Sequence, residues 1–233
     1  MQPKAPLILI SGLLCDEALW AHQVKSLKNI ADCHVADTTR HDRIELVARD
    51  VLAMAPPRFA LAGLSMGGYV AFEILRQAPQ RVLRLCLLDT TARPDTAEQK
   101  ERRKLLLAMA RTGKFRGVTP RLLPMLIYPD RLRDAPLTET VMGMAERMGP
   151  EVFQRQQMAI LHRVDSRPTL GAIACPTQVI GGMQDTLTPP DLLREIANGI
   201  SGARLDLIER CGHLAPLERP DEVGALMARW LTA

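Results

Sequence analysis

Long apolar runs, paired cysteines and a strong net charge are all missing from this chain of 233 residues. No apolar run approaches the roughly 18 residues that a membrane-spanning helix needs, so we expect no membrane partner. The net charge is only +4 and 3% of the residues are aromatic. Without a basic stripe interleaved with aromatic side chains, a nucleic-acid partner is not expected either. The five cysteines are odd in number and widely spaced, which predicts free and mostly buried thiols.

The start of the chain raises the question of an export signal. Residues 6–14 are apolar, Lys4 precedes them and Cys15 follows, as in a lipid-modified leader. The residues before a cleavage point should be small, however, and here they are Leu13 and Leu14. We therefore interpret this run as a buried strand and expect a cytoplasmic protein.

Short apolar runs of strand length alternate with helical patterns along the chain. The runs are apolar on both faces, which is typical of a parallel sheet covered by helices on both sides. The predicted strands are residues 7–11, 33–37, 58–64, 82–89, 177–182 and 203–209, and the predicted helices include 44–54, 67–78, 190–200 and 219–231. This alternation predicts an α/β fold with about six mostly parallel strands flanked by helices.

Residues 92–170 break the alternation. They contain no convincing strand but several amphipathic helical segments, such as 97–111 and 139–160, punctuated by proline and glycine. We expect a helical cap inserted between two strands of a core domain that comprises residues 1–91 and 171–233.

Residues 63–68, GLSMGG, lie where a strand pattern gives way to a helical pattern. The G-x-S-x-G spacing is that of a nucleophile elbow, a sharp turn that lifts the hydroxyl of Ser65 clear of the sheet. Side chains two residues before and after the serine would collide across the turn, which explains Gly63 and Gly67. The amides and dipole of the following helix would favour an oxyanion there. The alternative is a glycine-rich turn whose serine only caps the helix.

A serine becomes a good nucleophile when a histidine takes its proton and a carboxylate orients that histidine. In this kind of fold the chain order is Ser, acid, His. His213 lies in a loop after the last predicted strand and before the final helix, where a mobile base belongs. The other histidines are interpreted as surface or packing residues: His22, His34, His41 and His162.

Two aspartates compete for the role of the acid. Asp185 follows the predicted strand 177–182 in a loop that ends in two prolines, and it is the choice that the chain order favours. Asp89 ends the strand 82–89, and its carboxylate could also reach the histidine. Hydrogen bonds to loop amides would explain an aspartate at the end of a strand equally well.

These motifs resemble the α/β-hydrolase superfamily, in its compact group of capped esterases, lactonases and carbon–carbon hydrolases. The resemblance covers nearly the whole chain, and the stretches that carry it are SGLLCDEALW (11–20), GLSMGG (63–68), RPTLGAIACPTQVIGGMQDTLTPP (167–190) and CGHLAPLERPDEV (211–223). It implies Ser65 as nucleophile, Asp185 as orienting acid and His213 as base.

The resemblance also implies an oxyanion hole made of two backbone amides. One is the amide of Met66, directly after the nucleophile. The other should come from the loop after the first strand, where relatives often carry His-Gly and this chain carries Ser11-Gly12. Leu13 is the expected donor, with Leu14 as the fallback.

The mechanism expected from this set is two-step acyl transfer on a small-molecule ester or lactone. No zinc-ligand spacing, P-loop or dinucleotide fingerprint occurs, so no cofactor or metal is expected. Two other functions remain open. The same three residues serve carbon–carbon hydrolases and lyases in relatives, and the same fold also serves ligand receptors without steady turnover.

Positive charge is concentrated in the predicted cap. Residues 92–170 hold 15 lysines and arginines but 9 acidic residues, whereas the rest of the chain holds 15 and 17. Solvated faces of amphipathic helices explain this excess. Alternatively, the cap attracts an anionic substrate or an acidic carrier protein that bears the acyl chain, in which case Arg102, Arg103 and Lys104 are the first charges to test.

Overall fold

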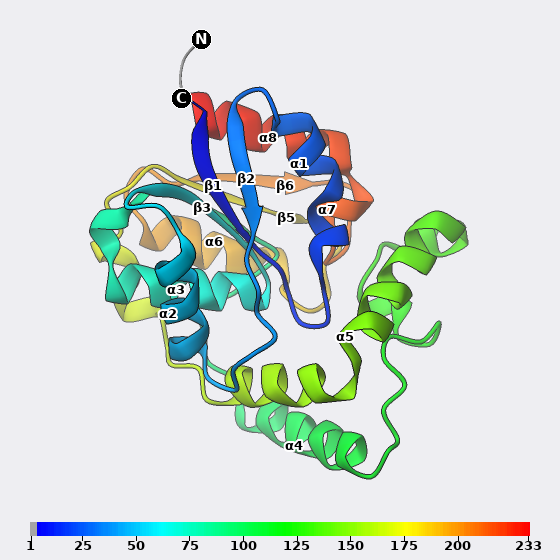
Figure 1. The fold of residues 1–233 in the computed structure, drawn as a ribbon. Helices are drawn as coiled ribbons and strands as arrows, with labels where there is room; N and C mark the ends of the chain where they lie inside the picture. The colour runs from blue at the N-terminus through cyan, green and yellow to red at the C-terminus, as the bar shows by residue number, and fades with distance from the viewer. Residues whose placement is uncertain (1–3) are drawn as a thin grey trace.

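A computed structural model describes residues 4–233 and contains one six-stranded sheet with the spatial order β2-β1-β3-β4-β5-β6 (Figure 1). The strands are β1 (Ala5–Ile10), β2 (Ala31–Val35), β3 (Phe59–Leu64), β4 (Val82–Leu88), β5 (Thr177–Gly182) and β6 (Arg204–Ile208). Every neighbouring pair is parallel. The predicted α/β class and the six parallel strands are therefore confirmed.

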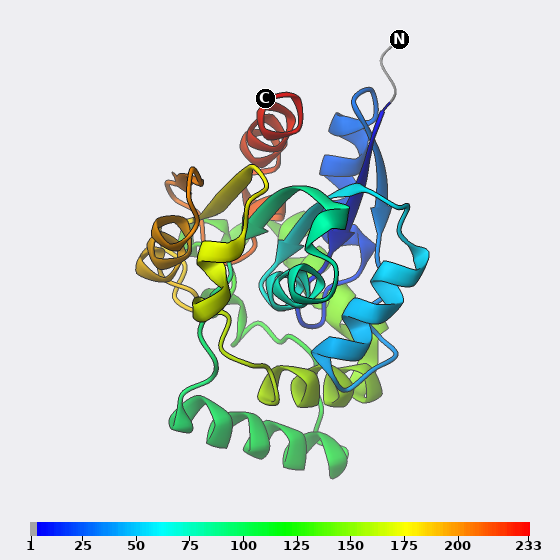
Figure 2. The same ribbon diagram turned by 90° about the vertical axis from the view of Figure 1, so that its left-hand side faces the viewer.

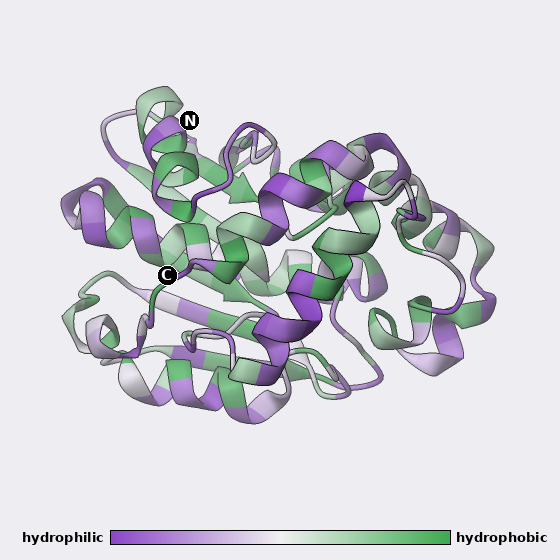
Figure 3. Ribbon diagram, turned by 90° about the horizontal axis from the view of Figure 1, so that it is seen from below, coloured by the Kyte–Doolittle hydropathy of each residue, from purple (hydrophilic) through white to green (hydrophobic). Residues whose placement is uncertain are grey.

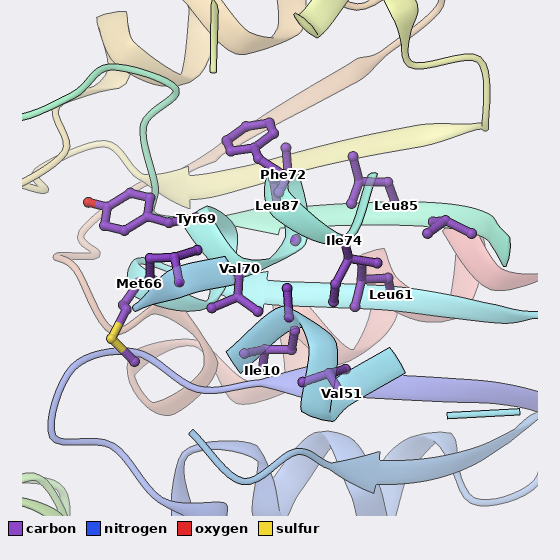
Figure 4. Close-up of a cluster of buried hydrophobic side chains, with 14 of the residues drawn as sticks. Ile10, Val51, Leu61, Met66, Tyr69, Val70, Phe72, Ile74, Leu85 and Leu87 are labelled. Atoms are coloured by element: carbon purple, nitrogen blue, oxygen red, sulfur yellow. The ribbon is translucent and has the colours of Figure 1, made fainter. Parts of the chain in front are cut away.

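Alternate residues of the inner strands pack into two separate hydrophobic layers. Ile8 and Leu61 belong to the layer beneath α2, α3 and α6, while Leu7 and Leu9 belong to the layer beneath α1 and α8. These helices are α1 (Ala21–Leu27), α2 (Ile44–Met54), α3 (Met66–Gln77), α6 (Pro190–Gly199) and α8 (Pro220–Thr232). Figure 4 shows the first of these layers, with side chains of α3 interleaved with those of the strands. Both faces of each inner strand are buried, which is why its sequence is apolar without alternation.

The segment between β4 and β5, residues 92–170, is called the cap segment below. It holds α4 (Ala97–Arg111) and α5 (Ala135–Leu161) and no strand. In two views these helices lie together at one end of the molecule, with α4 outermost (Figure 1, Figure 2). Seen from that end, the helices carry hydrophilic stretches beside hydrophobic ones (Figure 3). The division into a core domain and a cap stays a prediction.

A break divides α5 at Gly149, whose φ of 70° and ψ of 177° are not helical. Glycine adopts this positive φ without strain, and the Pro150 that follows has no amide to donate to the preceding turn. The sequence pattern predicted a single helix over 139–160, but the helix starts at Ala135 and bends at this pair.

Short helical turns complete the chain: η1 (Glu17–Trp20), η2 (Pro79–Arg81), η3 (Leu123–Met125), η4 (Pro129–Arg133), η5 (Arg167–Ala172) and the small helix α7 (Ala215–Glu218). Across residues 4–233, no helix has both the length and the apolar character needed to cross a bilayer. The same residues contain no cluster of three or more histidine, cysteine, aspartate or glutamate side chains arranged to hold a metal ion.

Candidate active site

Ser65 occupies the junction between β3 and α3 with φ 53° and ψ −112°. A positive φ is uncommon for a residue with a side chain and requires support from its surroundings. Here the Ser65 amide donates to the Leu88 carbonyl at 2.9 Å. The Ser65 carbonyl accepts from the Thr90 hydroxyl at 2.7 Å and from the Gly68 amide at 2.9 Å. The turn is therefore held by the end of β4 as well as by its own helix.

Three glycines around Ser65 are required by close backbone approaches. A Cβ on Gly63 would lie 2.4 Å from the Gly67 carbonyl oxygen, across the turn as expected from the sequence. A Cβ on Gly67 would instead lie 2.1 Å from the Ile10 carbonyl oxygen at the end of β1. A Cβ on Gly68 would lie 2.3 Å from the Thr90 hydroxyl. The neighbouring strands, not the turn alone, thus exclude side chains at two of these positions.

The structure brings Ser65, His213 and Asp185 together from three separate loops. Ser65 Oγ lies 2.9 Å from His213 Nε2, and His213 Nδ1 lies 2.7 Å from Asp185 Oδ2. The histidine is 5% exposed and the aspartate 3%. Asp185 follows β5, and His213 lies between β6 and α7. A nucleophile, a base and an orienting carboxylate are therefore within hydrogen-bond reach of one another.

The Asp185 carboxylate is also bound by its own loop. Oδ1 accepts from the amides of Leu187 at 2.8 Å and Thr188 at 3.1 Å. The Thr188 hydroxyl donates to Oδ2 at 2.5 Å. Burial on its own would raise the pKa of Asp185, but the adjacent His213 and these hydrogen bonds lower the pKa below its ordinary value. The carboxylate is thus ionised at neutral pH, and it accepts a hydrogen bond from Nδ1–H of the imidazole ring.

His213 has its pKa raised above the ordinary value of 6.5. Burial would lower this pKa, but the charge of Asp185 and its hydrogen bond to the ring outweigh burial, and Asp89 and Glu218 add to the effect. Because ionised Asp185 accepts the hydrogen on Nδ1, Nε2 of the neutral ring is left as an acceptor that faces Ser65 Oγ.

Asp89, the competing aspartate, does not touch the imidazole. It lies fully buried just after β4, and its oxygens accept from the Gly182 amide at 2.9 Å and the Ala215 amide at 3.2 Å. Burial and the nearby Asp185 raise its pKa well above the usual range. The sequence left two roles open for Asp89: orienting the histidine, or accepting hydrogen bonds from backbone amides. The structure contains the hydrogen bonds to amides. They join the end of β5 to the start of α7, which follows His213.

Glu218 is a residue of this site that sequence reasoning missed. Its side chain is 1% exposed, and its oxygens accept from the amides of Tyr128 at 2.6 Å, Gly212 at 2.9 Å and Leu214 at 3.3 Å. Burial raises its pKa. Two of the three amides flank His213, and the third belongs to the cap segment. A glutamate five residues after the histidine, at a proline-bounded turn, was the available signal.

The two candidate oxyanion donors before Cys15 differ in their contacts. The Leu14 amide donates to the Gln156 side-chain oxygen at 2.9 Å, so the fallback donor is occupied. The Leu13 amide donates to no protein acceptor within residues 4–233. Met66 is the first residue of α3, where amides have no partner inside the helix. These contacts leave Leu13 and Met66, rather than Leu14, for an oxyanion.

Four histidines lie outside this arrangement. His22 is paired with Asp221 at 3.2 Å and His41 with Asp50 at 2.8 Å. His34 lies exposed on β2, and His162 caps the end of α5.

Ion pairs neutralise part of the positive charge of the cap segment. Arg103 and Arg163 both bind the buried carboxylate of Asp95, at 2.5 and 2.7 Å, and Lys104 binds Glu101 at 2.7 Å. Arg103 is thus paired with a buried acid and Lys104 with an exposed one, and their role toward a ligand stays a prediction. Cap-segment residues 100–121 also contain cations with no ion pair inside residues 4–233: Lys100, Arg102, Arg111, Lys114, Arg116 and Arg121.

A groove of about 530 Å³ lies between α3 and the segment before β5, with Val82 and Cys175 in its walls. Val82 begins β4, whereas the site lies where the strands end, so this groove is separate from Ser65.

Comparisons with known proteins identify the family of the chain. Residues 14–226 match the model of the alpha/beta hydrolase family. The chain is 25% identical over 231 residues to a pimeloyl-[acyl-carrier protein] methyl ester esterase of Nitrosomonas europaea, covering 93% of this chain and 91% of that one. It is 29% identical to a thermophilic esterase from Thermogutta terrifontis (TM-score 0.88, covering 98% and 89%). It is 25% identical to the enol-lactonase from Burkholderia xenovorans LB400 (TM-score 0.89, covering 99% and 92%).

Proposed function

Because the chain belongs to the alpha/beta hydrolase family, we propose that it hydrolyses an ester or lactone of a small carboxylic acid through Ser65, His213 and Asp185. The observation that carries this proposal is the continuous hydrogen-bonded series from Ser65 Oγ through the imidazole to the Asp185 carboxylate, at 2.9 and 2.7 Å. The similar chains named as esterases and as an enol-lactonase support the same reaction class.

In the acylation step, His213 Nε2 takes the proton of Ser65 Oγ as that oxygen attacks the substrate carbonyl. The carbonyl π electrons move onto its oxygen, which the Leu13 and Met66 amides would stabilise. The resulting imidazolium is stabilised by Asp185, to which it donates from Nδ1. It then gives the Nε2 proton to the leaving alkoxide, and the C–O bond breaks to leave an acyl group on Ser65.

In the deacylation step, a water molecule takes the place of the alcohol. His213 removes its proton while the oxygen attacks the acyl carbonyl, and the collapse of this second tetrahedral species returns the proton to Ser65 Oγ. A lactone follows the same course, except that its alcohol and acid leave as one molecule.

Among esters and lactones, the positive charge of the cap segment favours an anionic substrate. Its unpaired cations between residues 100 and 121 would draw in a carboxylated ester, or an acidic carrier protein that presents the acyl ester. The similar esterase from Nitrosomonas europaea is named for an ester on an acyl-carrier protein.

The test is a kinetic screen of aryl esters of graded acyl length, small lactones and carboxylated esters, with Ser65→Ala as the control. We expect Ser65→Ala to abolish turnover and labelling by a fluorophosphonate while the protein stays folded. Full labelling of the variant would mean that another residue is the nucleophile. If the wild-type protein reacts with the fluorophosphonate but, without that reagent, turns over no ester or lactone, carbon–carbon cleavage or ligand binding would be favoured instead.

A further inference from the structure

Leu14, in the loop after β1, has a backbone conformation that needs an explanation. Its φ is 58°, in the left-handed region that bulky residues rarely adopt. Its side chain is 7% exposed and packs in a small hydrophobic cluster with Ala145 and Phe153 of α5. The loop that carries the candidate oxyanion donor is thus strained at one residue and packed directly against the cap segment.

Gln156, on the second half of α5, binds this strained residue. The side chain is 1% exposed, and its oxygen accepts from the Leu14 amide at 2.9 Å. Its nitrogen donates to the Thr38 hydroxyl at 3.1 Å and lies 3.5 Å from the Thr38 carbonyl oxygen. Since the Leu14 amide can only donate and the Thr38 carbonyl can only accept, the two ends fix the orientation of the Gln156 amide.

We propose that Gln156 is a positioning residue for the oxyanion hole: it holds Leu14 in the left-handed conformation, so that the Leu13 amide remains free for the substrate oxygen. Without this acceptor, the buried Leu14 amide would be unsatisfied, which favours relaxation to a negative φ. That relaxation would rotate the peptide that joins Leu13 to Leu14 and would displace Leu13, whose own amide belongs to the preceding peptide. Within residues 4–233, Gln156 makes no hydrogen bond to Ser65, His213 or Asp185, so in this proposal it acts through the loop.

This role makes the cap segment part of the catalytic machinery rather than a cover alone. Within residues 4–233, the side-chain hydrogen bonds of Gln156 to the core run to the loops after β1 and β2. Glu218 and Asp89 separately bind amides beside His213. Loss of Gln156 should therefore change oxyanion stabilisation and leave the titration of the base unchanged. The inference rests on the proposed ester hydrolysis.

The experiment compares Gln156→Leu with Gln157→Leu on an aryl ester. Gln157 is the matched control because it is the next residue of α5, is also buried (2% exposed), and accepts a hydrogen bond from Arg103 at 2.7 Å within the cap segment. Complete loss of one oxyanion donor costs about 100- to 1000-fold in rate, so a misplaced donor in Gln156→Leu should lower kcat about 10- to 100-fold. We expect KM to change less than about threefold, and Gln157→Leu to retain its kcat within the same factor.

Two further measurements separate positioning from general damage to the fold. A boronic acid that forms a tetrahedral adduct on Ser65 should bind Gln156→Leu more weakly by the same factor by which kcat/KM falls. The acidic limb of the pH–kcat/KM profile should not move. Thr38→Val, which removes only the hydroxyl partner of Gln156, should show a smaller loss in the same direction.

Equal losses in Gln156→Leu and Gln157→Leu, or a loss confined to KM, would overturn the proposal. So would an unchanged affinity for the boronic acid. If the wild-type protein hydrolyses no ester, the proposed function fails instead, and amide hydrogen exchange decides the structural part. Exchange at the Leu14 amide should accelerate in Gln156→Leu but not in Gln157→Leu. Equal protection in both variants would show that Gln156 does not hold the Leu14 amide.

Discussion

Replacing Gly63 by alanine probes how tightly the turn at Ser65 is built. The new Cβ would lie 2.4 Å from the Gly67 carbonyl oxygen and 2.8 Å from the Gly68 amide nitrogen, whereas ordinary contacts begin at 3.4 Å. The backbone must therefore open by about 1 Å, and a displacement of this size near the reacting atoms costs on the order of 100-fold in rate. Overpacking of this kind also destabilises a protein by about 1–3 kcal/mol.

The assay pairs kcat/KM for an aryl acetate with urea unfolding, and Gly171→Ala is the control because nothing lies within 4 Å of its added Cβ. We expect the control to keep full activity and the Gly63 variant to lose about 100-fold at a protein concentration and temperature where it is still folded. Activity within threefold of the wild type, with stability equal to that of the control, would show that the elbow is looser than its backbone distances indicate.

Three further outcomes are expected. Asp185→Asn should lower kcat on the order of 10⁴-fold by leaving the imidazole in the wrong tautomer, and Asp89→Asn should cost far less because Asp89 binds amides; the reverse ranking would make Asp89 the acid. Since catalysis needs neutral His213 and its pKa is raised, kcat/KM should fall as pH drops through a value above 6.5; Asp185→Asn should move this limb to lower pH, and an unmoved limb would mean that another group titrates. For a carboxylated ester, kcat/KM should fall as the Debye length shortens from about 10 Å at 0.1 M salt to about 3 Å at 1 M, and Arg102→Gln with Arg116→Gln should weaken that response. A neutral analogue that responds equally would refute attraction by the cap.

The strands and the turn at Ser65 were readable from the sequence because both are encoded locally. Strands buried on both faces need continuous apolar runs, and helices between them need an apolar stripe. The turn needs glycine where backbones meet, and the Cβ contact at Gly63 across the turn agrees with that reasoning. The chain order of nucleophile, acid and base predicted which residues would meet, and Ser65, His213 and Asp185 do lie together. Their catalytic roles remain predictions.

Residue pairs far apart in the sequence were decided only by the tertiary structure. Arg103 looked like a charge offered to a ligand, yet Asp95 and Gln157 engage it within the cap segment. A side chain at Gly67, which the sequence explained by the turn, would also collide with the end of β1, and one at Gly68 would collide with Thr90 after β4.

The clearest cases are Glu218 and Gln156, neither of which was expected at the site from the sequence. Each binds backbone amides: Glu218 reaches Tyr128, 90 residues away, and Gln156 reaches Leu14, 142 residues away. A backbone amide is the same group at every residue, so the sequence carries no sign of which amide a distant side chain will bind. Burial decides it, because a polar side chain enclosed by the fold must bind the donors that the surrounding loops present.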